Sequence, residues 1–222
     1  MVSRLPKWVE YGAFILALVA GFVNAVGLLG FQHQSISHLS GITTLIGTGL
    51  ANSSLVQTAH LALIIVAFVI GAAISGFFLR SGALKMGRNY SGLLALEGLL
   101  LLIAIGFLKF DSSLGHYFAS AACGLQNAMV TTYSGAVIRT THVTGIFTDI
   151  GLMIGAKLRG EPFDTRKALL FGLIVSGFIA GGTFGAVMFS YYTFNALYVP
   201  AAICGLLALS YRWYRQGQGQ GV

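Results

Sequence analysis

Two histidines in this 222-residue chain stand in nearly the same short sequence, about a hundred residues apart. His38 lies in Ser-His-Leu-Ser-Gly-Ile-Thr-Thr and His142 lies in Thr-His-Val-Thr-Gly-Ile-Phe-Thr, 104 residues further on. An imidazole can donate, accept or carry a proton near neutral pH. Ser and Thr beside it are residues that start helices. The pattern indicates two helix N-termini, each with a histidine, in two copies of one unit.

The chemistry that this pattern favours is the binding of a small polar or anionic solute. A helix N-terminus presents free N–H groups and the positive end of the helix dipole, and Gly41 and Gly145 allow the backbone to approach a ligand closely. Asn24 and Asn127 precede the two motifs in Gly-x-x-Asn-Ala blocks, 103 residues apart. The candidate solute-binding residues are Asn24, Ser37, His38, Ser40, Gly41, Thr44, Asn127, Thr141, His142, Thr144, Gly145 and Thr148.

Each of these side chains also has a structural interpretation. A buried histidine in a membrane bundle can bond a neighbouring carbonyl or hydroxyl group, and Asn24 and Asn127 can join helices. Two matched intramembrane histidines favour function more than one does. A metal or haem between them is disfavoured, because no Cys, His or carboxylate cluster surrounds them. We expect no metal, no cofactor and no enzyme, since a nucleophile–base set is also lacking.

Acidic residues are few, so those within apolar stretches stand out. Glu97 and Asp149 lie inside apolar segments, where an unpaired carboxylate is costly. Their counterparts in the repeat are Cys204 and Leu45, so the shared architecture does not require an acid at either place. They are the candidates for proton or cation coupling. The alternative is a static ion pair or a neutral carboxylic acid bonded to a carbonyl.

The composition is that of an integral membrane protein. Hydrophobic residues make up 56% of the chain and charged residues 9%, against about 25% charged residues in soluble domains. The net charge of +7 comes from basic residues in short loops. Such residues set membrane orientation, and we expect no nucleic-acid partner. The expected partners are the lipid bilayer and the solute.

We expect an all-α membrane protein with six spans and two short broken or re-entrant helices. The spans are expected at about 8–30, 55–79, 90–109, 114–137, 167–190 and 192–211. The short segments, about 37–52 and 141–157, are either thin spans or re-entrant half-helices. If both are re-entrant and the N-terminus is cytoplasmic, 12 of the 13 Lys and Arg face the cytoplasm, as the positive-inside tendency favours. Both termini are then cytoplasmic.

The repeat makes one transmembrane domain, 1–215, from two halves of about 8–110 and 111–212, followed by a tail at 216–222 that we expect to be disordered. Three crossings per half is an odd number, so the second half must be inverted relative to the first. The alignment pairs Gly71 with Gly177 and Ser75 with Gly181. These small residues suit close helix packing, either within the chain or in a homodimer.

The paired motifs resemble the DUF1275, or YoaK, family of bacterial membrane proteins. The resemblance rests on the two Asn-Ala blocks and the two histidine motifs, and it covers about residues 8–212. The family pattern has Asn at the place of Ile42. The resemblance implies a bacterial inner-membrane location and names no substrate.

These observations favour a small secondary transporter or channel, with its site between the two motifs. The alternative is a membrane scaffold, sensor or assembly factor that transports nothing. A wet cavity that reaches both motifs would favour transport, and a dry, tightly packed bundle would favour the alternative.

Overall fold

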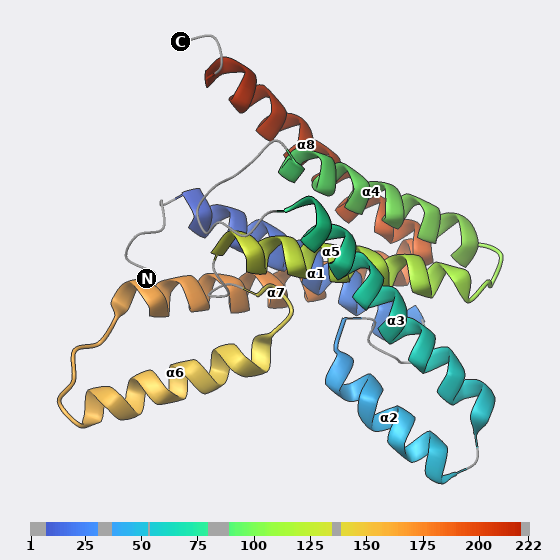
Figure 1. The fold of residues 1–222 in the computed structure, drawn as a ribbon, viewed down its shortest axis with the longest axis horizontal. Coiled ribbons are helices and arrows are strands. Elements are labelled where there is room, and N and C mark those ends of the chain that lie inside the picture. Colours follow the sequence, from blue (N-terminus) through green and yellow to red (C-terminus); the bar gives the residue numbers. More distant parts are fainter. Residues whose placement is uncertain (1–7, 31–36, 53, 80–88, 135–138, 219–222) are drawn as a thin grey trace.

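The computed structural model describes residues 8–30, 37–52, 54–79, 89–134 and 139–218, and there is no strand among them. Figure 1 shows one bundle of long helices with two shorter helices beside it. The elements are α1 (Trp8–Gly30), α2 (Leu39–Ala51), α3 (Leu55–Phe78), α4 (Asn89–Leu108), α5 (Leu114–Ser134), α6 (Val143–Leu158), α7 (Thr165–Tyr192), the 3-10 helix η2 (Thr193–Leu197) and α8 (Tyr198–Gln218).

Four helical stretches in the described residues are long and apolar enough to cross a membrane. They are Val9–Gly30, Leu55–Phe78, Asn89–Leu108 and the 50-residue stretch Thr165–Tyr214. The last includes α7, η2 and most of α8. The fold class is therefore all-helical and compatible with a membrane protein. α5 is not among the four, and it carries His116, Gln126 and Asn127.

The ends of the last two long helices differ from the expected bounds. α7 continues to Tyr192, and η2 then separates it from α8, which starts at Tyr198 rather than 192. Thr193 turns the chain with a positive φ of 50°, and Pro200 lies in the first turn of α8, where its missing N–H costs nothing. α8 runs on to Gln218, so the first residues of the predicted tail are helical. Residues 219–222 lie outside the described residues.

Helices that the repeat makes equivalent run in opposite directions. In Figure 1, α1, α4 and α7 run from left to right, whereas α3, α5 and α8 run from right to left. The repeat pairs α1 with α5, α3 with α7, and α4 with α8. The start of α1 and the end of α8 lie at the same end of the bundle.

Two pairs of helices, α1 with α7 and α3 with α5, cross through the same kind of contact. A Cβ atom on Gly21 would lie 2.8 Å from the carbonyl carbon of Phe178, and one on Gly124 would lie 2.8 Å from that of Phe68. Real Cβ atoms do not come this close to backbone. Glycine is therefore what allows both crossings.

At each of the two crossings, a second glycine makes the same close backbone contact. A Cβ on Gly71 would lie 2.7 Å from the carbonyl carbon of Ala121, and one on Gly181 would lie 2.7 Å from that of Leu18. These contacts match Gly71 with Gly181, one helical turn away from the alignment with Gly177. Both stretches carry small residues four positions apart, so sequence similarity alone does not distinguish the two registers. The glycines pack within the chain.

The third pair of equivalent helices, α4 and α8, packs together at equivalent residues. A Cβ on Gly98 would lie 3.1 Å from the Ala201 carbonyl oxygen and 3.5 Å from the Cys204 Cβ. The side chains of Glu97 and Cys204, which the repeat aligns, form a hydrogen bond. Two matched positions that touch each other are expected at an axis of internal pseudo-symmetry.

The two short helices lie at the side of the bundle. α2 packs on α3 and α6 packs on α7. In the view of Figure 1, both begin near the middle of the molecule, and they run outward to opposite ends. Each has a single buried residue, Ile42 in α2 and Ile146 in α6, at the same position of the repeat.

Candidate functional site

The first motif is held together by hydrogen bonds to its own turn and to α1. The Ser37 hydroxyl donates to Asn24 Oδ1 on α1 at 2.7 Å. His38 is the N-cap of α2, and its Nδ1 accepts the Gly41 N–H at 3.2 Å. The Thr44 hydroxyl donates back to the Ser40 carbonyl at 3.0 Å, one turn earlier. The motif therefore fixes the start of α2 and leaves the His38 side chain exposed.

The second motif begins α6 in the same way but caps it differently. His142 is the N-cap residue and is exposed, but its side chain makes no capping bond. Its ring lies over Gly145, where any Cβ would collide with it. The Thr148 hydroxyl donates to the Thr144 carbonyl at 3.0 Å, as its counterpart in α2 does.

The two motifs occupy separate helices in this structure. α2 and α6 do not pack on each other within the described chain. The convergence of both motifs on one solute therefore stays a prediction. In both motifs, an exposed histidine is the N-cap residue of a helix, and its ring lies next to the glycine three residues further on.

Gln126, which the sequence analysis did not single out, ties the second motif to the core. Its Nε2 donates to the Leu16 carbonyl on α1 at 2.9 Å and lies 3.1 Å from Thr140 Oγ1. Gln126 and Thr140 are both buried. The neighbouring Asn127 leaves its buried Oδ1 without a protein partner in the described chain. The sequence held one sign that Gln126 has a special role. It stands directly before Asn127 in the second block, where the first block has the apolar Val23 before Asn24.

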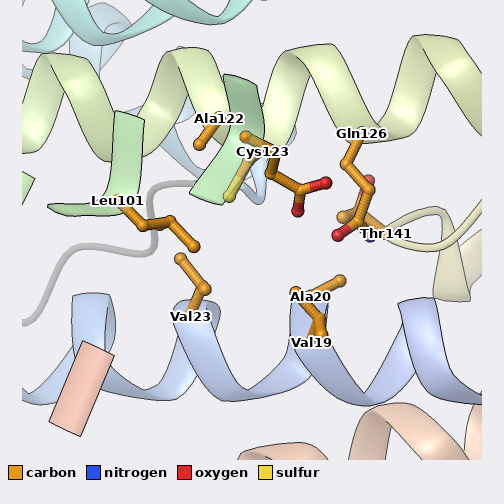
Figure 2. Close-up of a pocket in the computed structure, with 9 residues that line it drawn as sticks. Val19, Ala20, Val23, Leu101, Ala122, Cys123, Gln126 and Thr141 are labelled. Carbon is orange, nitrogen blue, oxygen red and sulfur yellow. The ribbon is translucent and has the colours of Figure 1, made fainter. Parts of the chain in front are cut away.

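A small cavity beside Glu97 lies between α1, α4 and α5. Figure 2 shows Val19, Ala20 and Val23 of α1 facing Leu101, Cys123 and Gln126, with Thr141 at one side. Its volume is about 10 Å³, enough for one water molecule. The cavity touches the second motif through Thr141, and its lining includes no residue of the first.

Glu97 itself is 2% exposed, and its Oε2 has no hydrogen-bond partner within the described residues. The carboxyl group bonds the Cys204 thiol. A fully buried carboxyl group with one unbonded oxygen is costly as an anion, and either a proton or a water molecule in the cavity would lower that cost.

Asp149, the second coupling candidate, is in an ion pair. Its Oδ2 lies 3.4 Å from Lys167 Nζ, and its side chain is 44% exposed. Lys167 lies in the first turn of α7, where Asp164 caps the helix. A static pair is one of the interpretations that the sequence left open.

A cluster of three rings joins α3 to α5 at the start of both helices. His60 Nδ1 lies 2.8 Å from the Tyr117 hydroxyl, and His60 Nε2 lies 3.1 Å from His116 Nδ1. Sequence spacing does not bring His60 and His116 together, because they are on different helices. In the described parts of the chain, no three or more His, Cys, Asp or Glu gather to hold a metal.

A family model for a protein of unknown function (DUF1275) matches residues 12–210. The chain belongs to this family. The resemblance stated from the sequence motifs is thereby confirmed, and it covers most of the chain. No curated protein and no solved structure matches the chain. In this DUF1275 protein, the Ile42 side chain is buried against Leu61 and Ile64 of α3.

Proposed function

We propose that this DUF1275 protein is a small transporter or channel of the bacterial inner membrane for a small polar or anionic solute. The observation that carries the proposal is the duplicated glycine crossing, whose two copies run in opposite directions. An inverted duplication places equivalent surfaces toward the two sides of a membrane. It is a common architecture of secondary transporters, which bind their solute near the midplane.

Six spans fit the helices better than four. The 50-residue stretch Thr165–Tyr214 contains two long helices, and one crossing takes roughly 20 residues. α5 is polar because it packs between α3 and α4, not because it is outside the membrane. Its buried Ser120 hydroxyl donates to the Ile64 carbonyl at 2.9 Å, and Gln126 is bonded too. Internal bonding of this kind is what a span requires.

The lengths of α2 and α6 support re-entrant segments. With 13 and 16 residues, and a rise of about 1.5 Å per residue, they extend about 20 and 24 Å. The hydrocarbon core is about 30 Å thick. A helix that begins near the middle and runs outward needs only part of that thickness. It also presents its N-terminus, and with it His38 or His142, at membrane depth.

Glu97 is the proposed coupling residue. It is buried at the contact between α4 and α8, beside a water-sized cavity that reaches the second motif. Taking up and releasing one proton there would change the charge between the two halves. Because its counterpart is Cys204, only one half carries the acid, and a directional carrier needs such an asymmetry.

The alternative, a membrane scaffold or sensor, is favoured by one observation. The cavity has room for a single water molecule and touches only the second motif. A transporter with this structure is closed, and it must open between the halves to admit a solute.

The test is uptake by proteoliposomes from a panel of small anions and polar solutes, with and without a pH gradient. The variants are His38→Ala and His142→Ala, and Glu161→Gln, on an exposed loop, is the matched control. We expect at least one solute to accumulate with wild type and the control, and its uptake to fall in both histidine variants. If no solute accumulates and none raises the melting temperature, the scaffold alternative replaces this proposal.

A further inference from the structure

The ring cluster between α3 and α5 has the geometry of a metal-binding pair. His60 Nε2 and His116 Nδ1 point at each other across 3.1 Å. Two nitrogen ligands of one tetrahedral Zn²⁺, each at 2.0–2.1 Å, lie about 3.3 Å apart. A small rotation of the rings would place one ion between them.

The Tyr117 hydroxyl gives His60 Nδ1 a partner in the tautomer that can bind a metal. It lies 2.8 Å from Nδ1, and in that tautomer Nδ1 donates its proton to the phenol oxygen while Nε2 carries the lone pair. Metal-binding histidines usually have their other ring nitrogen held by such a partner. An ion between the rings would replace the hydrogen bond between His60 Nε2 and His116 Nδ1, with the His116 proton on its Nε2 so that both facing nitrogens present lone pairs.

The two rings stand on a rigid platform. The Ser120 hydroxyl bonds the Ile64 carbonyl across the same helix pair at 2.9 Å, and Gly71 and Gly124 bring the two backbones into contact further along. Tyr117 also packs on the buried cluster of Ile42, Leu61 and Ile64. A site that is already formed loses little entropy when an ion binds.

The duplicated architecture does not account for this cluster. In the register that the glycine contacts set, the counterparts of His60 and His116 are Leu170 of α7 and Ala13 of α1. Both counterparts are buried and apolar, so the shared packing of the two halves does not require a histidine at either place.

We propose that His60 and His116 together bind one borderline-soft divalent cation, such as Zn²⁺, Ni²⁺ or Cu²⁺. Imidazole nitrogens suit these ions. No third His, Cys or carboxylate joins the pair in the described chain, so water completes the coordination, as it does in sites that keep open positions. The cation clamps the starts of α3 and α5 together, and the inference does not depend on transport.

The first experiment is thermal unfolding of the untagged protein in detergent, with increasing Zn²⁺. At pH 7.5 we expect a saturable rise in melting temperature, because the ion binds the folded protein and not the unfolded chain. His60→Gln and His116→Gln should each abolish the rise, and His38→Gln and His142→Gln should leave it unchanged. Tyr117→Phe should keep the site but weaken Zn²⁺ binding by about tenfold or more.

The second experiment counts the ligands directly, and its decisive measurement uses the wild-type protein, which does not depend on how well a variant folds. The electron paramagnetic resonance spectrum of the wild-type protein with one equivalent of Cu²⁺ should show splitting from two imidazole nitrogens. The single variants should show one. A wild-type spectrum without two nitrogens, or a Zn²⁺ response that survives in His60→Gln, would overturn the metal site and leave the pair as a hydrogen bond. Either outcome leaves the transport proposal standing.

Discussion

His38 and His142 occupy the same repeat position, yet their rings act differently at the starts of α2 and α6. The ring of His38 accepts a backbone N–H through Nδ1, whereas that of His142 lies over Gly145 without a capping bond. The first half of the molecule therefore uses its histidine side chain to cap a helix, whereas the second half does not. This difference between matched residues gives the first prediction.

His38→Ala should loosen the first turn of α2, because the loss of an N-cap costs about 1 kcal/mol. Amide exchange in residues 39–43, measured by mass spectrometry, should accelerate by about fivefold. His38→Asn, which keeps a capping acceptor, should stay close to wild type. His142→Ala should leave exchange in α6 unchanged, and an equal acceleration in both helices would refute the assigned difference.

Glu97→Gln should separate transport from its driving force. The amide has nearly the shape of the acid but cannot take up a proton, so solute uptake should persist and no longer respond to a pH gradient. Asp149→Asn is the matched control, because its carboxylate is in a half-exposed ion pair worth about 1 kcal/mol or less. Gradient-driven uptake in the Glu97 variant would rule out this residue as the coupling group.

At the scale of helices, apolar length and the repeat predicted where most elements lie. Runs of about 20 apolar residues predicted α1, α3 and α4 to within a residue or two of their bounds. The turn after α7 was placed too early, because Tyr191, Tyr192 and Phe194 continue the apolar run and conceal it. The partners of Glu97 and Gln126 could not be predicted, since they depend on which helices pack together. The register of α7 was ambiguous because small residues recur every turn.

The glycine crossings give the element-scale prediction. Gly21→Ala and Gly124→Ala should destabilise the fold by similar amounts, about 1–3 kcal/mol or more, because each Cβ would meet a carbonyl group of the crossing helix. Gly12→Ala, where a Cβ meets nothing within 4 Å, is the control and should not destabilise. Melting temperatures in detergent would measure this. A large effect at only one of the two crossings would argue against equivalent halves.

For the whole molecule, the matched residues Glu97 and Cys204 touch, the two glycine crossings agree, and the paired helices run in opposite directions. Together these support one inverted duplication around an axis near the α4–α8 contact. Three crossings in each half make six, an even number, so this arrangement predicts both termini on the same side of the membrane, the cytoplasm. The ends of α2 and α6 then face opposite sides of the membrane.

Cysteine labelling tests this arrangement most directly. In a background with Cys123→Ala and Cys204→Ala, single cysteines are placed at Asn52 after α2, at Asp111 between α4 and α5, and at Glu161 after α6, all of which are exposed. A membrane-impermeant maleimide added to intact spheroplasts should label Asn52→Cys and Asp111→Cys, and label Glu161→Cys only in inverted vesicles. Labelling of Asn52→Cys and Glu161→Cys from the same side would contradict the inverted duplication.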